Sequence, residues 1–388
     1  MKKVVLSTVA MVALSSFASA NTEIDALRAQ MTAMQNKISE LESKQKDQDE
    51  AAKKTTGTII KSKAPVIEFS GTNYLGFVSS KKDGGDRVNN FESRRNYIQT
   101  KAYFKENPKD YVRVTLDTFQ QNKDTASDDT GSWEVRLKYA YLYLDNILPY
   151  TGVEIGQAHR PWIDYEEHNA WNYRSISKVL VEDKLGADWT NSADLGVNFQ
   201  TKTPYFSSEL GLFNGEGYHG TLDTDNDNGL SAEWRMTAHI LGTGQQKAKS
   251  DLQYANVSFF GQMNQDNKKG IDLGGGNYDD FNWYGFHAVY NQPEFLVAAQ
   301  YIKSQDAAVA YAGKGYSVNG EYRINPDWSV IGRYDKFDLD DGTDKSRKLA
   351  GIGYAYNKNV KLIANYLQET DTAGADKDSI MLTADIDW

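Results

Sequence analysis

Apolar and polar residues alternate one by one along most of the chain after residue 66. In the segment 111–117, for example, Val112, Val114 and Leu116 alternate with polar residues. A period of two places successive side chains on opposite faces of a β-strand. Segments of this kind recur up to the last residue, which predicts one all-β architecture.

In the segment 133–144, side chains are also predicted to alternate between an apolar face and a face with three charged residues. The apolar face would consist of Val135, Leu137, Tyr139, Tyr141 and Tyr143, against Glu134, Arg136 and Lys138. This face is unusually rich in tyrosine for the interior of a soluble sheet.

About sixteen segments are predicted to be strands, an even number within the range of outer-membrane barrels. They span residues 66–78, 91–104, 110–120, 132–145, 152–160, 192–202, 206–213, 231–240, 252–263, 280–291, 294–303, 312–323, 328–338, 347–357, 360–369 and 379–388. Connections after even-numbered strands are mostly short and those after odd-numbered strands are longer and polar, with 241–251 as the long exception. Short turns at one rim and long loops at the other are typical of a transmembrane antiparallel β-barrel.

The positions of the seven prolines agree with this division of the chain into strands and connections, because all fall at predicted strand ends or in connections. There, a missing backbone N–H costs no hydrogen bond of the sheet. A soluble β-sandwich or β-solenoid would also show alternation and prolines in turns. However, the face opposite the tyrosines repeatedly holds Arg, Lys, Asp, Glu and Thr. A lipid-facing exterior and a wet interior fit this pattern better than a dry core.

The first 65 residues follow a different pattern. Residues 1–20 combine a basic start, an apolar core and an Ala18-x-Ala20 end, which predicts a signal peptide rather than a membrane anchor. Residues 21–50 show heptad spacing and are predicted to form a short α-helical coiled coil, which either bundles with copies of itself or docks as a lone helix. Its seam is Ile24, Leu27, Met31, Met34, Ile38 and Leu41. Residues 51–65 are predicted to link it to a barrel formed by 66–388.

The longest connection, residues 161–191, follows the fifth predicted strand and is the third long loop. Its first part holds Trp162, Tyr165, Trp171 and Tyr173, which is too aromatic for a solvated disordered loop. We expect this loop to fold inward, to narrow the lumen and to present acidic side chains there. The predicted constriction residues are Arg160, Asp164, Glu166, Glu167 and Arg174.

The polar face of strands two to four offers basic residues that would lie opposite this acidic loop. These predicted wall residues are Arg95, Lys101, Arg113, Arg136 and Lys138. Opposed charges would set a transverse electric field across a constriction, where low-dielectric surroundings strengthen each charge. The alternative for each residue is an ordinary salt bridge that stiffens the barrel.

The amino-acid composition argues against several classes of function. The chain has no cysteine, which excludes disulfides, thiolate metal sites and cysteine nucleophiles. Its formal net charge of −10 argues against nucleic acid as a partner. The five histidines show no metal-ligand spacing, and the acidic segment 223–229 departs from a calcium loop because Trp234 stands where the bidentate Glu belongs. We therefore expect no cofactor, no metal and no enzymatic activity.

Several features together resemble the bacterial outer-membrane porins of the trimeric sixteen-stranded type. These features are the export signal, the N-terminal coiled coil, Arg94-Arg95, the strand 111–117, the long third loop, the Asp194–Val197 return strand and a terminal aromatic residue. The sequence is most similar to the phosphate-selective porin O and P group and related coiled-coil-bearing porins. It departs from the family in ending with Trp388 where Phe is usual. It also mixes Arg with Asp and Glu where that group has a dense basic ladder, so phosphate selectivity is not carried over.

The resemblance implies a homotrimeric outer-membrane porin with its coiled coil in the periplasm. Its partners would be outer-membrane lipid and lipopolysaccharide, and it would pass small polar solutes or ions by passive diffusion. The alternative is an outer-membrane adhesin or cell-wall-linking barrel without an open pore.

Overall fold

The computed structural model describes residues 66–120, 133–219, 229–372, 374 and 376–388, together with Thr32, Asn36 and Lys37. Residues Ala64–Trp388 form one compact unit and Met1–Lys63 form another. In the N-terminal unit, the three described residues are helical. The predicted signal peptide, the six seam residues and the linker 51–65 lie outside the described residues.

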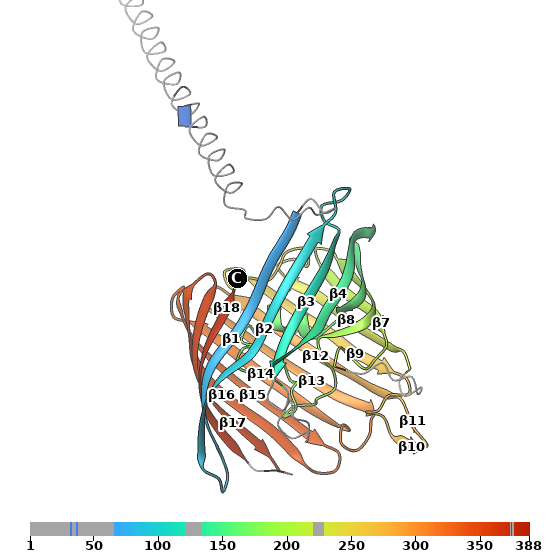
Figure 1. Ribbon diagram of the computed structural model, residues 1–388, viewed down its shortest axis with the longest axis vertical. Helices are drawn as coiled ribbons and strands as arrows, with labels where there is room; N and C mark the ends of the chain where they lie inside the picture. The colour runs from blue at the N-terminus through green and yellow to red at the C-terminus, as the bar shows by residue number, and fades with distance from the viewer. Residues whose placement is uncertain are drawn as a thin grey trace, which may run out of the picture. The chain divides into compact units, whose positions relative to one another are not determined.

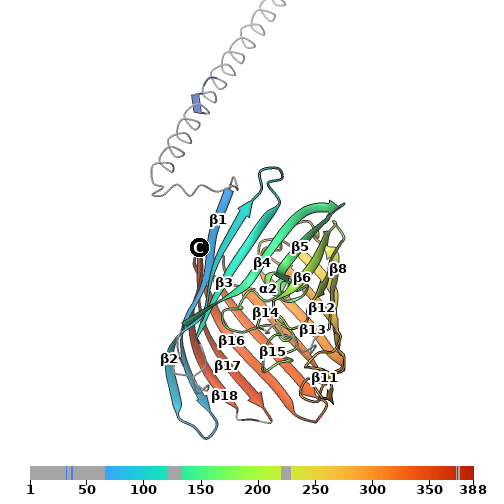
Figure 2. The same cartoon turned by 45° about the vertical axis from the view of Figure 1, so that its right-hand side comes forward.

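Within the described part of the chain, sixteen strands pair antiparallel in a closed barrel (Figures 1 and 2). Neighbouring barrel strands follow one another along the chain, and β1 closes the sheet against β18. The small hairpin β10–β11 lies outside the barrel sheet, so β9 pairs with β12. The prediction of an all-β antiparallel barrel of about sixteen strands is confirmed.

The strand boundaries follow the predicted segments closely. The strands are β1 Val66–Lys82, β2 Arg87–Tyr103, β3 Tyr111–Gln120, β4 Trp133–Leu148, β5 Thr151–His159, β6 Ala193–Lys202, β7 Phe206–Phe213, β8 Ser231–Leu241, β9 Tyr254–Asn264, β10 Asp272–Gly274, β11 Asn277–Tyr278, β12 Phe281–Gln292, β13 Phe295–Asp306, β14 Gly313–Arg323, β15 Trp328–Leu339, β16 Asp344–Asn357, β17 Val360–Asp371 and β18 Lys377–Asp387. One helix, α2 Ile163–Asn169, lies in the long connection after β5. Among the described residues, no helix is long and apolar enough to cross a membrane.

The two faces of the sheet differ in polarity. On β3, Val112 and Val114 are exposed on the outside, whereas Thr115 and Asp117 are buried inside. The same alternation recurs on the other strands, so that large apolar side chains cover the outer surface. This is the reverse of a water-soluble protein, because exposing apolar surface to water costs about 25 cal/mol per Å².

One strand departs from the predicted alternation. Between β3 and β4, Thr115 pairs with Tyr139 and Leu116 pairs with Leu137, which leaves Lys138 as an extra residue in a β-bulge. Each bulge shifts the residues beyond it to the other face. Tyr139 and Tyr141 therefore point inward and are buried. The prediction that they share the outer face of Leu137 is wrong for this reason.

The last residue seals the barrel at the junction of β1 and β18. Trp388 and Gly71 exchange two backbone hydrogen bonds of 3.0 and 2.7 Å, and Trp388 Nε1 donates to Asn73 Oδ1 at 2.8 Å. The indole packs directly over Gly71, where a Cβ atom would lie 2.4 Å from the ring. Only glycine therefore allows this contact, which ties the C-terminus to the first strand.

Replacing Trp388 by Ala should lower the thermal stability of the folded barrel, because the hydrogen bond to Asn73 alone contributes about 1 kcal/mol. The measurement is the temperature at which the folded form is lost in a heat-modifiable electrophoretic shift. Trp133→Ala is the matched control, because Trp133 is 51% and Trp388 54% exposed. Equal destabilisation by the two substitutions would contradict a sealing role of Trp388.

Candidate functional site

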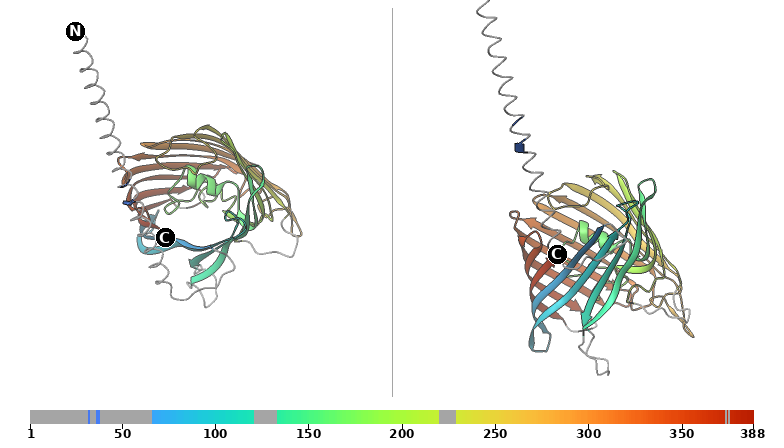
Figure 3. Two further views of the ribbon diagram at one scale, coloured as in Figure 1. Left: turned by 90° about the horizontal axis from the view of Figure 1, so that it is seen from above. Right: turned by 45° about the horizontal axis from the view of Figure 1, so that its top comes forward.

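The connection 160–192, which contains α2, lies inside the barrel (Figure 3, left). Its aromatic residues pack against the inner wall formed by strands between β9 and β18. Trp162 stacks on Phe260 with ring centroids 3.5 Å apart, and Trp189 lies 5.4 Å from both Trp283 and Phe337. Aromatic pairs of this kind add about 0.5–1.5 kcal/mol each beyond the burial of their surface. This half of the interior therefore contains an apolar cluster beneath the loop.

Buried ion pairs fix the loop at its start and at its far end. Arg160 donates to both carboxylate oxygens of Glu233, and its Nη2 also donates to Gln262 at 2.8 Å. Near the end of the loop, Asp183 pairs with Arg347 of β16. Removing one partner of such a buried pair costs about 3–5 kcal/mol, so the loop is held firmly in place.

A further ion-pair network lies within the loop itself. Arg174 pairs with Glu167 and donates to Glu182 with N···O distances of 2.6 and 2.9 Å. Lys178 also reaches Glu182, at 3.1 Å. Although burial alone would raise the pKa of Glu182, Arg174 and Lys178 hold that pKa well below its usual value. The network therefore stays ionised at neutral pH.

Two of the predicted constriction residues do not face the central cavity. Arg160 is 3% and Glu166 1% exposed, and neither lines the central cavity. Glu166 accepts hydrogen bonds from Trp162 Nε1 at 2.8 Å and from Gln300 Nε2 at 2.5 Å. The prediction that Glu166 faces the lumen is wrong because α2 turns it toward the wall. Asp164 and Glu167, three residues apart, share the opposite face of the helix.

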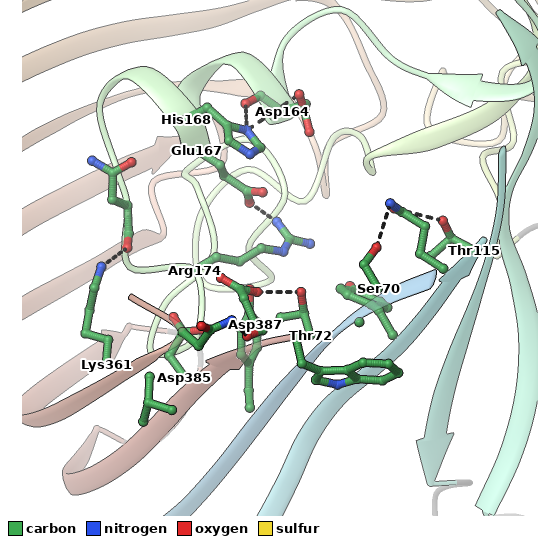
Figure 4. Close-up of a pocket in the computed structure, with 18 of the residues that line it drawn as sticks. Ser70, Thr72, Thr115, Asp164, Glu167, His168, Arg174, Lys361, Asp385 and Asp387 are labelled. Carbon is green, nitrogen blue, oxygen red and sulfur yellow. Dashed lines mark hydrogen bonds and ion pairs between the residues drawn. The ribbon is translucent and has the colours of Figure 1, made fainter. Parts of the chain in front are cut away.

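The other half of the interior is open. A cavity of about 700 Å³ lies between the loop and the wall of β1–β4, with the ends of β16–β18 at its side. Asp164, Glu167 and Arg174 line it from the loop, and the predicted wall residues Arg113 and Lys138 line it from the sheet. Figure 4 shows the loop side chains on one side and Ser70, Thr72 and Thr115 on the other. Arg95, Lys101 and Arg136 do not line this cavity.

Tyrosine rings, instead of carboxylates, hold most of the wall cations. The guanidinium of Arg113 lies 4.5 Å above the Tyr139 ring, and Lys138 Nζ donates to Tyr97 Oη at 2.9 Å. Arg95 Nη1 donates to the same Tyr97 oxygen at 2.6 Å.

The two remaining wall cations differ in their partners. Lys101 Nζ lies 5.2 Å above the ring of Tyr111. Arg136, by contrast, pairs with Asp117 at 2.8 Å. Within the described residues, Arg136 is the one wall cation that forms an ion pair with a carboxylate, and the other four contact tyrosines instead.

Asp164 is the acidic residue that faces these cations. Its side chain is 50% exposed and lies 3.5 Å from His168 Nδ1 and 3.9 Å from His159 Nε2. Burial alone would raise the pKa of Asp164, but His168, His159 and Arg113 hold it below its usual value. The same carboxylate raises the pKa of His168. Asp164 thus carries a full negative charge across the cavity from the wall.

Several cavity residues were not among the predicted site residues. Tyr97 lies two positions after Arg95 on the same face of β2. The alternation in the sequence could therefore have identified it as a wall residue. Lys361, Asp385 and Asp387 line the cavity from β17 and β18 (Figure 4). These residues lie near the loop because the barrel closes between β18 and β1. A pattern within one short segment of the sequence does not show which distant strands meet. In the described ranges, no group of three or more His, Asp or Glu side chains could hold a metal ion.

The sequence and the structure were compared with those of known proteins. No protein-family model matches the sequence, and no curated protein matches it. Among solved structures, the barrel is similar to an anion-selective porin from Comamonas acidovorans, with 12% identity, 83% of this chain and 99% of that chain covered and a TM-score of 0.61. OprB of Pseudomonas putida matches at 9% identity, with 83% and 94% covered and a TM-score of 0.62. Salmonella typhi OmpF in complex with daunomycin matches at 13%, with 83% and 97% covered and a TM-score of 0.57. The chain therefore has a porin-like barrel fold.

Glu166 should make the stability of the protein depend on pH, because burial raises the pKa of Glu166 from 4.5 to about 7. The folded protein therefore keeps a proton that the unfolded chain releases above pH 4.5, so stability falls as the pH rises from 4.5 to about 7 and changes no further above that. Glu166→Gln should raise the melting temperature at pH 8 and change it little at pH 5.

The control is Glu106→Gln, an exposed carboxylate in the turn after β2, which should show no such difference between the two pH values. Melting followed by circular dichroism in detergent gives the result. An equal effect of Glu166→Gln at both pH values would show that this carboxyl does not titrate as its surroundings require.

Proposed function

We propose that this protein is an outer-membrane porin, through which small hydrophilic solutes and ions diffuse passively. The observation that carries the proposal is the polar cavity of about 700 Å³ inside a closed barrel with an apolar outer surface. A closed sheet satisfies all its backbone hydrogen bonds internally, as a hydrocarbon environment requires. The loop 161–191 narrows the channel from one side.

The same proposal includes the environment of the chain. The apolar exterior would contact outer-membrane lipid and lipopolysaccharide, and the functional unit would be a homotrimer. Residues 1–20 would direct export, and residues 21–50 would form a coiled coil in the periplasm. Support for these points comes from the sequence patterns and from the porin-like fold.

Solutes are sorted by the charges on the two sides of the channel. Asp164 on the loop faces Arg113 and Lys138 on the wall across the cavity. Such a transverse field orients water and small polar solutes, and it opposes the entry of large apolar ones, which cannot replace the ordered water. Since Arg113 and Lys138 line the cavity without a carboxylate partner, we expect anions to pass more readily than cations.

Proteoliposome swelling tests the proposed function directly. Vesicles that contain the purified protein should swell in isotonic solutions of small sugars and stay intact in solutions of large oligosaccharides. Vesicles that remain tight to all solutes at high protein density would favour an adhesin or cell-wall-linking barrel without an open pore.

Replacing Asp164 by Asn should make the channel more anion-selective. A unit charge acts on an ion about 8 Å away with roughly 0.5 kcal/mol in water, so the permeability ratio should change about two-fold. The measurement is the reversal potential in a salt gradient across a planar bilayer. Glu166→Gln removes a carboxylate from the same helix but away from the cavity, and it should leave the ratio unchanged. The placement of Asp164 is refuted if both variants behave alike.

Neutralising the wall should have the opposite effect. The double variant Arg113→Gln, Lys138→Gln removes two cations without an ion-pair partner from the cavity and should shift the reversal potential toward cation preference. Arg136→Gln is the control, because Arg136 is paired with Asp117 and does not line the cavity. A larger shift in Arg136→Gln than in the double variant would mean that solutes follow another route.

A further inference from the structure

A second, smaller cavity adjoins the large one at the rim of short turns. It measures about 300 Å³ and is lined by residues 325–327 between β14 and β15, by residues 248–250 between β8 and β9 and by the loop after α2. The larger cavity reaches the same rim at residues 357–359, where β16 turns into β17. Four residues line both cavities and form the boundary between them. They are His168, Asn172, Ala355 and Lys361.

The side chain of Lys361 spans this boundary from the barrel wall to the loop. Two of the four boundary residues belong to the wall, Ala355 on β16 and Lys361 on β17, and they pair directly across the two strands. Ala355 carries a single methyl group, which is too short to bridge the space. Lys361 Nζ donates to the backbone carbonyl of Asn172 at 3.3 Å (Figure 4). It also lies 4.5 Å from the centre of the Tyr173 ring, so the lysine connects the wall with the loop.

The loop side of this bridge is fixed in place. Tyr173 is 2% exposed, and its hydroxyl group donates to Glu321 Oε1 on β14 at 2.5 Å. The same hydroxyl lies 2.8 Å from Ser329 Oγ on β15. Because Tyr173 is anchored to two strands, the backbone of Asn172 beside it is held as well. The side chain of Lys361 is therefore the movable part of the boundary.

Two weak contacts hold Lys361 against the loop. Its hydrogen bond of 3.3 Å to the Asn172 carbonyl is longer than usual and lies in an exposed position. Asp385 on β18 is the direct cross-strand neighbour of Lys361 and lines the larger cavity. Across the described ranges, however, Lys361 forms no ion pair with a carboxylate. Since the four-carbon stem of lysine is flexible, the ammonium group can leave the loop and turn toward Asp385.

We propose that Lys361 is a specificity-determining residue of the channel, which limits the size of the solutes that pass the rim of short turns. This inference rests on the proposed porin function. With Lys361 against the loop, a solute meets two separate narrow spaces, and when the side chain turns aside, the two cavities become one wider passage. Small anions contact the ammonium group directly, because Lys361 lines both spaces.

Two substitutions at Lys361 separate the length of the side chain from its charge. Lys361→Ala removes the bridge, so it should raise the single-channel conductance and shift the size limit in proteoliposome swelling to larger sugars. Lys361→Met keeps a long side chain that packs against the Tyr173 ring, so it should preserve the size limit. Because Lys361→Met removes a positive charge, it should lower the anion-to-cation permeability ratio about two-fold in dilute salt.

Lys358→Ala is the matched control, because it makes the same change at the same rim. Lys358 is exposed beside β17 and lines the larger cavity without bordering the smaller one, so its substitution should leave the size limit unchanged. The proposal is overturned if Lys361→Ala keeps the conductance and the size limit of the unchanged protein. It is also overturned if Lys358→Ala or Lys361→Met widens the passage as much as Lys361→Ala.

Chemical rebuilding of the side chain provides a second test. The chain has no cysteine, so Lys361→Cys introduces a single thiol. An aminoethyl methanethiosulfonate reagent converts this thiol into a positively charged side chain of about the length of lysine. The conductance of Lys361→Cys channels should then fall in steps to that of the unchanged protein, and Lys358→Cys channels should not respond. If the unchanged protein conducts but the reagent has no effect at position 361, this inference fails alone. If the unchanged protein does not conduct at all, the proposed function fails.

Discussion

Closure of the sheet between β1 and β18 is the constraint on which the rest of the structure depends. A closed antiparallel sheet leaves no unpaired edge, and it forces every strand to present one face outward and one inward. The two halves of the resulting interior differ in polarity. Strands between β9 and β18 contribute Phe260, Trp283 and other apolar side chains, whereas β1–β4 contribute hydroxyl, amide and charged groups. The loop after β5 fills the apolar half, where its tryptophans pack against the wall, and the polar half remains free.

Much of this fold could be predicted from the sequence, because successive residues of a barrel strand face outward and inward in turn, which gives the sequence a period of two. The predicted strand 206–213 coincides with β7, and most other ends differ by one to three residues. The largest difference is at β1 and β2, which continue to Lys82 and start at Arg87 although residues 79–90 are polar. The backbone ladder of a hairpin continues where its side chains no longer alternate, so hydrophobicity cannot mark its end.

The site was only partly predictable. An aromatic loop and basic strand faces identified Asp164, Glu167, Arg113 and Lys138, all of which line the cavity. Glu166 was misplaced because a short helix inside a loop imposes a period of 3.6 that seven residues barely reveal. The inward orientation of Tyr139 depends on a bulge at Lys138, and bulges leave no simple sequence signal. The contribution of β17 and β18 arises from closure between distant parts of the chain. Such contacts require the three-dimensional arrangement.

The central claim is that the interior is divided into a dry half under the loop and a wet half along β1–β4. Thiol accessibility in a chain without native cysteine measures this division most directly. Gln99 lines the free cavity from β2, whereas Ile302 is fully buried beneath the loop on β13. In membrane-embedded protein, a water-soluble thiol reagent should modify Gln99→Cys rapidly and Ile302→Cys far more slowly. Equal rates at the two positions, or rapid modification at Ile302→Cys alone, would contradict the division of the lumen.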